Sequence, residues 1–177
     1  MKQNTQLGRD RGIAHIIDIK HKHVSLYAIW LEGDEGDSEL QWDDIGIICF
    51  MDWNTCRDFA EAKGHGISTE PIMKYDLDSI ADWATSPIAL PVDCDLLLNF
   101  VNFIDDATPI GEEREGLRDR QQGDIYHKLF WGNNLVSVTP PGEHYIPTWS
   151  EDELTELQEM VEEGLAYWSR SMHLHEG

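Results

Sequence analysis

The sequence predicts a single α+β domain in which a small N-terminal, mostly antiparallel sheet is packed by central and C-terminal helices. Residues typical of strands, such as Ile, Val, Tyr and Trp, dominate the first third of the chain. In the later part, apolar residues recur at helical spacing instead. No linker rich in Pro, Gly or Ser divides the 177 residues, of which 41% are hydrophobic, so we expect one domain over residues 1–177.

Three strands are expected, over Ile13–Lys20, Val24–Leu31 and Ile45–Met51. In the second strand both alternating sets of side chains are largely apolar, which predicts a strand that is covered on both faces. Two glycines within residues 32–38 indicate a turn or a flexible loop there. Because strands close in sequence tend to pair, we expect the three to be neighbours in the sheet.

Four helices are expected to follow, over Thr55–Lys63, Asp76–Ala84, Pro91–Ala107 and Gln121–Trp131. The third is apolar almost all round, which predicts a buried central helix. A strand over Leu96–Ile104 is the alternative, but the length and the leucines of the segment favour the helix. Gly132-Asn133-Asn134 supplies a left-handed stop after the fourth helix, and Pro140-Pro141-Gly142 predicts a turn.

The last helix has the clearest signals. Ser150 is the expected N-cap, Glu153 completes a capping box, and Trp149 is placed to staple against Leu154. The residues of one face recur at three-to-four spacing and predict an apolar stripe: Leu154, Leu157, Val161, Leu165 and Trp168. The acids of the first turn and the bases Arg170 and His173 near the end suit the helix dipole.

The charge excludes several classes of function. With 34 Asp or Glu against 13 Lys or Arg, the chain carries a formal charge of −21, which repels phosphate backbones and anionic membranes. No apolar run is long enough for a membrane span, and the N-terminal residues lack the apolar core of a secretory signal. We therefore expect a cytoplasmic protein that binds neither nucleic acid nor membrane. Its three cysteines, Cys49, Cys56 and Cys94, are expected to be buried free thiols.

Motifs for catalysis or metal binding are scarce. The chain has no Walker, dinucleotide-binding, GxSxG or HExxH motif. His21 and His23, like His173 and His175, are spaced to share one face, but two ligands do not make a zinc site, and the second pair is expected in a fraying tail. We expect no metal and no cofactor.

Asp52 ends a buried strand, and Asp105-Asp106 follows an apolar run, an arrangement that resembles haloacid dehalogenase-like phosphatases. The resemblance fails because Asn54 stands where that family has its general acid, and Thr55 comes one position early. An acid-rich setting also raises the pKa of a thiol, which argues against a Cys-His hydrolase. The expectation is that the protein is not an enzyme and has no catalytic residues.

Acidic residues concentrate in two stretches, residues 32–44 and residues 151–163, and each holds seven acids and no base. The helix dipole accounts for many acids of the second stretch. In the first, Trp42 lies among carboxylates, and an aromatic ring surrounded by acids suits a basic protein partner. The alternative is that Trp42 covers a sheet edge.

Three segments resemble a family of small bacterial proteins that includes immunity proteins of contact-dependent growth inhibition systems: residues 97–106, 127–135 and 139–149. The resemblance implies an immunity protein that neutralises a cognate toxin, and these segments are expected at core and turn positions. It transfers no binding residues.

The hypothesis is therefore a non-catalytic immunity protein that occludes the basic active-site surface of a toxin, a nuclease by preference. The toxin-binding residues are predicted from charge alone as Asp34, Glu35, Asp37, Glu39, Trp42, Asp43 and Asp44. Two alternatives stay open: an acidic adaptor or nucleic-acid mimic that binds another basic protein, and a small hydrolase that uses Asp52 with Asp105 or Asp106.

Overall fold

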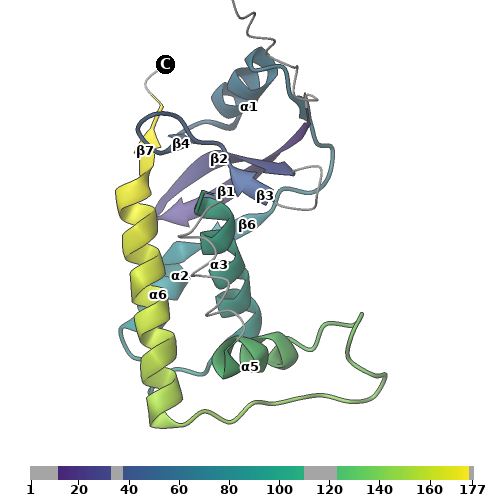
Figure 1. The fold of residues 1–177 in the computed structure, drawn as a ribbon, viewed down its shortest axis with the longest axis vertical. Helices are drawn as coiled ribbons and strands as arrows, with labels where there is room; N and C mark the ends of the chain where they lie inside the picture. Colours follow the sequence, from purple (N-terminus) through teal and green to yellow (C-terminus); the bar gives the residue numbers. More distant parts are fainter. Residues whose placement is uncertain (1–11, 33–37, 110–122, 176–177) are drawn as a thin grey trace, which may run out of the picture.

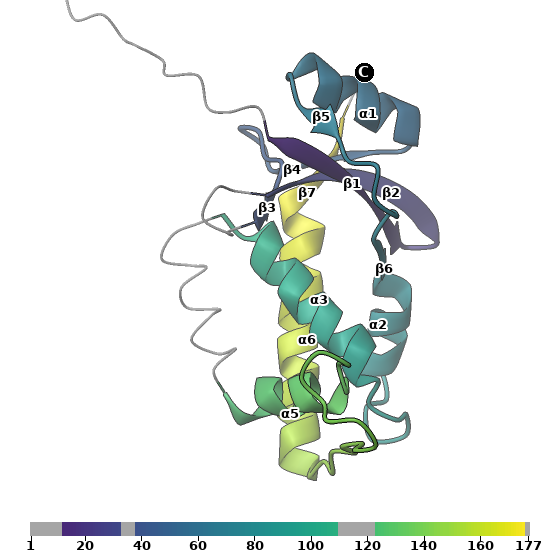
Figure 2. The same cartoon turned by 90° about the vertical axis from the view of Figure 1, so that its right-hand side faces the viewer.

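The computed structural model describes residues 12–32, 38–109 and 123–175, and these form one mixed sheet with helices on both faces. Figure 2 shows α1 on one side of the sheet and α2, α3 and α6 on the other. The α+β class predicted from the sequence is confirmed.

The strands predicted in the first third are present and lie next to one another. They are β1 (Ile13–His21), β2 (Val24–Glu32) and β4 (Ile47–Phe50), and a short β3 (Ser38–Leu40) lies between the last two in sequence. β2 pairs antiparallel with the other three. Lys22 and His23, with φ of 51° and 64°, form the two-residue turn from β1 to β2, which matches the twist of a hairpin.

Three further strands make the sheet mixed. β5 (Gly66–Ile67) and β6 (Lys74–Asp76) run parallel to β1, and β7 (Met172–Leu174) runs parallel to β4. The expectation of a fraying C-terminal tail is therefore wrong, because His173 belongs to β7 and the His175 ring packs between Phe50 and Phe59.

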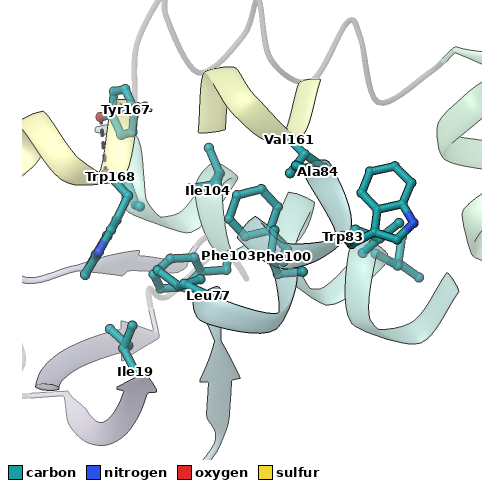
Figure 3. Packing of buried hydrophobic residues seen from close by; sticks show 14 of the residues in the cluster. Ile19, Leu77, Trp83, Ala84, Phe100, Phe103, Ile104, Val161, Tyr167 and Trp168 are labelled. Atoms are coloured by element: carbon teal, nitrogen blue, oxygen red, sulfur yellow. Dashed lines mark hydrogen bonds between the residues drawn. The ribbon is translucent and has the colours of Figure 1, made fainter. Parts of the chain in front are cut away.

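The sheet separates two apolar clusters, as the sequence of β2 predicts. Leu26 and Ala28 face the larger cluster, while Ile29 faces the smaller one beneath α1 (Trp53–Ala62). The helices of the larger cluster are α2 (Leu77–Ala84), α3 (Cys94–Ala107), α5 (Asp124–Gly132) and α6 (Glu151–Ser171). α3 is the buried central helix, and Figure 3 shows its Phe100, Phe103 and Ile104 packed between α2 and α6.

Side-chain caps determine where the helices begin. Asp52, Asp76 and Asp93 each accept a hydrogen bond from a backbone N–H in the first turn of α1, α2 and α3. Ser150 and Glu153 form the predicted capping box of α6. Asn134, with φ of 53°, adopts the left-handed conformation expected after α5.

Candidate functional site

The predicted toxin-binding residues fall partly outside the described chain. Asp34, Glu35 and Asp37 lie outside the described residues. Glu39 lies on β3, and Trp42, Asp43 and Asp44 continue from β3 into the turn that leads to β4. The candidate site is therefore this acidic turn, which we define as residues 42–47.

The acidic turn is tight, and its own side chains hold it. Trp42 and Ile47 form an isolated antiparallel bridge, and the N–H of Asp43 donates to the carbonyl oxygen of Gly46 at 3.0 Å. One carboxylate oxygen of Asp43 accepts from the N–H of Ile45 at 2.8 Å and from that of Gly46 at 3.0 Å. An Asp that bonds its own turn in this way stabilises one backbone conformation.

The Asp43 carboxylate is held by internal partners. The backbone N–H of Ile45, then that of Gly46, and then the His173 side chain lower its pKa below the ordinary value. His173 Nε2, on β7, lies 3.0 Å from the same carboxylate oxygen. Asp43, Asp44 and Ile45 are all exposed, Ile45 to 78%, but the Asp43 carboxylate organises the turn while Asp44 and Ile45 form its tip.

The end of α6 supports the acidic turn from behind. Gly46 is buried so closely against this end that a Cβ at position 46 would lie 2.0 Å from the carbonyl oxygen of Ser171. β7 then continues from α6 and pairs with β4. The tip is thus presented on a rigid base.

Trp42 and Glu39 lie beside a small cavity at the edge of β3. The indole is half-buried against the larger cluster, and among the described residues its Nε1 has no hydrogen-bond acceptor. Glu39 pairs in register with Leu31 on β2. The cavity, about 230 Å³, is lined by Leu31, Glu39, Leu40, Gln41, Trp42 and Pro109. Trp42 thus starts the acidic turn and packs its ring against the larger cluster, and its role as an anchor for a partner stays a prediction.

The carboxylates of the hydrolase alternative lie on helices that cover opposite faces of the sheet. Asp52 caps α1, and the N–H of Thr55 is the main cause of its lowered pKa. Asp106, at the end of α3, accepts from the Trp30 indole at 3.0 Å and from the Ser38 hydroxyl at 2.7 Å. Each of these two carboxylates thus has a clear structural role.

The described residues contain no group of three His, Cys, Asp or Glu side chains that could hold a metal ion. All three cysteines are buried free thiols, as predicted, and burial raises the pKa of Cys49 and Cys56 to about 12 and that of Cys94 to about 11. Within the described part of the chain, every helix is too short or too polar to cross a bilayer.

Comparison with known proteins gives a likeness of fold. No family model matches the chain, and no curated protein matches it in sequence. The chain is similar in structure to the C-terminal domain of SatS, which was crystallised in complex with bromine. The TM-score is 0.54 with 13% sequence identity, over 92% of this chain and 94% of that one. At this identity the likeness concerns the fold alone.

Sequence reasoning missed two features of the surface. One is a cavity of about 420 Å³ beside β1, lined by twelve residues that include His15, Trp30, Trp53 and Glu70. The other is a group of exposed apolar side chains between α5 and α6. Ile146 lies in a segment expected at core and turn positions, and that expectation is wrong for it, because it is 74% exposed; Val136, between two of these segments, is 95% exposed. Their lack of helical or strand periodicity is the signal that could have found them.

Proposed function

We propose that this chain is a non-catalytic immunity protein, which binds a cognate cationic toxin in the cytoplasm and covers the basic active-site surface of that toxin. A nuclease is the preferred toxin because its site holds a polyanion, and a surface that holds phosphates also attracts carboxylates. The proposal rests on the acidic turn, which presents Asp44 and Ile45 outward in one conformation.

Rigidity is what distinguishes this turn from an ordinary acidic loop. Asp43 fixes the turn from within, and Gly46 fits against the end of α6. A surface that is already ordered loses less conformational entropy on binding, so more of its contact energy appears as affinity. The net charge of −21 adds long-range attraction, which accelerates association with a basic protein.

The test uses the C-terminal domain encoded by the gene directly upstream, purified in a catalytically inactive form. Calorimetry measures its affinity for the wild-type chain and for Asp44→Lys. If Asp44 lies at the centre of the interface, charge reversal should weaken binding at least about 30-fold. Glu159→Lys is the matched control, because Glu159 is exposed on α6 and its reversal changes the net charge equally.

The double reversal of Asp43 and Asp44 to Lys should abolish protection of cells, but it also removes the internal bonds of the turn. Asp44→Lys is therefore the cleaner variant. Equal weakening by Glu159→Lys would show that net charge, not the turn, drives binding. If no cationic toxin domain is encoded next to this gene, or if that domain does not bind, the immunity assignment is overturned.

A further inference from the structure

The end of α5 and the segment that follows it carry the main group of exposed apolar side chains in the described part of the chain. We define residues 131–146 as the apolar arm. Its exposed large apolar residues are Trp131, Leu135, Val136, Val138, Tyr145 and Ile146. Figure 1 shows the chain leaving α5, running away from the helices and returning to the start of α6. Apolar surface gathered in this way is typical of an interaction site.

The apolar arm has defined internal structure. The side-chain amide of Asn134 donates to the carbonyl oxygen of Tyr145 at 2.9 Å, and its oxygen accepts from the N–H of Tyr145 at 2.7 Å. This pair of bonds closes residues 135–144 into a loop. Within it, the N–H groups of Val138 and Thr139 donate to the carbonyl oxygen of Leu135. Val136 is thus exposed on an ordered loop.

Further contacts fix the base of the arm to the helices. Gly132 fits so closely against Cys94 that a Cβ there would lie 2.5 Å from the cysteine sulfur. Lys128 on α5 donates to the carbonyl oxygen of Thr148 at 2.9 Å, pairs with Glu153, and lies over the Trp149 ring. The arm is therefore anchored at its departure and at its return.

The charge around the arm indicates what it binds. Residues 129–169 contain eight acids and no Lys or Arg. Lys128, at the base of the arm, pairs with one of these acids, Glu153, whereas Glu143, Glu151 and Asp152 beside the arm are exposed. A second copy of this chain would bring another charge of −21 to the contact, which disfavours self-association. An apolar partner surface edged by Lys and Arg would instead satisfy both the exposed apolar side chains and the acids around them.

We propose that the apolar arm is a docking surface for an amphipathic, cationic protein segment, whose apolar residues contact Val136 and Ile146 and whose basic residues meet the surrounding carboxylates. This inference goes beyond the proposed immunity function and does not depend on it, because the arm lies at the other end of α6 from the acidic turn.

The test measures by fluorescence anisotropy how tightly the full chain binds three fluorescein-labelled peptides, each about four helical turns long. The first peptide carries Leu on one face and Lys on the other. The second keeps the Leu face but replaces Lys with Glu, and the third keeps Lys but replaces Leu with Ser. The Leu–Lys peptide should bind at least about tenfold more tightly than either control. Equal binding of the Ser–Lys peptide would overturn the proposal, because net charge alone would then explain binding.

Variants of the chain locate the binding site. Val136→Asp and Ile146→Asp should each lower the affinity of the chain for the Leu–Lys peptide at least about tenfold. Urea unfolding of both variants should be unchanged, because both side chains are exposed. Ile13→Asp is the control, since Ile13 is exposed to 58% on β1. Unchanged affinity in the two arm variants would overturn the proposal.

Asn134→Gly tests whether the loop must be preformed. Glycine tolerates the positive φ of this position but lacks the amide that closes the loop, so peptide affinity should fall while the fold is kept. Sedimentation of the chain alone tests whether a second copy of the chain, instead of a cationic partner, covers the arm. A wild-type dimer that Val136→Asp dissociates would mean that a second copy covers the arm, and would overturn the proposal.

Discussion

An alanine at position 46 would create a clash between two segments of backbone. Its Cβ would lie 2.0 Å from the carbonyl oxygen of Ser171, whereas ordinary contact begins at 3.4 Å, so β4 and the end of α6 would have to separate by about 1.4 Å. Neither partner is a flexible side chain that could rotate away. The strain therefore falls on the pairing of β4 with β7, which starts with Ile47 opposite Met172.

The expected loss of stability follows from that movement. A separation of this size breaks the nearest ladder hydrogen bonds, each worth about 0.5–1.5 kcal/mol, and overpacking adds about 1–3 kcal/mol. Gly46→Ala should therefore lower the free energy of unfolding by about 3 kcal/mol. For a chain of this length, that loss corresponds to a fall in Tm of about 6–12 °C.

Urea unfolding followed by circular dichroism measures the change, and Gly66→Ala is the matched control. Gly66 lies in the edge strand β5, where a Cβ would meet nothing within 4 Å, so its alanine should stay within about 0.5 kcal/mol of wild type. If both variants unfold at the same urea concentration, the close fit of the acidic turn against α6 is refuted.

Three further outcomes are expected. Trp168→Ala should cost about 3–5 kcal/mol in urea unfolding, because the ring is fully buried. Asp43→Asn should lower Tm at pH 7 but much less at pH 3, because the lowered pKa of Asp43 adds stability only while the carboxylate is ionised, and that stability is lost as the pH falls through the folded-state pKa. Cys49, Cys56 and Cys94 should resist iodoacetamide at pH 8 in the folded chain and react in guanidinium, since burial raises the pKa of each thiol to about 11 or 12.

The features predicted most reliably from the sequence are those that arise from interactions between neighbouring residues. Ser150 and Glu153 form a capping box by their spacing alone, and the apolar residues of α3 identify a buried helix without knowledge of its neighbours. The alternation in β2 likewise predicts a strand covered on both sides. In each case the physical cause lies within a few residues of the effect.

Features that depend on distant segments could not be predicted in this way. β5, β6 and β7 have two or three residues each, and they are strands only because β1 and β4 offer an edge to pair with. The side-chain contact between Asp43 and His173 joins residues that are 130 positions apart in the sequence. Composition places Asp43 and Asp44 in one acidic patch, and the structure shows that the Asp43 carboxylate holds the turn while Asp44 lies at its tip.

α6 determines how the two proposed surfaces can be used. Its 21 residues span about 31 Å, from the return of the apolar arm to the contact of Ser171 with Gly46. An interface of standard size covers about 800 Å² on each partner, so a partner centred on the acidic turn extends only about 16 Å along this helix. The two surfaces should therefore be occupied at the same time. A saturating Leu–Lys peptide should leave the affinity of the toxin domain unchanged within about twofold, because distant sites contribute additively. If the peptide displaces the toxin domain in calorimetry, the toxin contacts the arm, and the assignment of separate partners to the two ends of α6 is wrong.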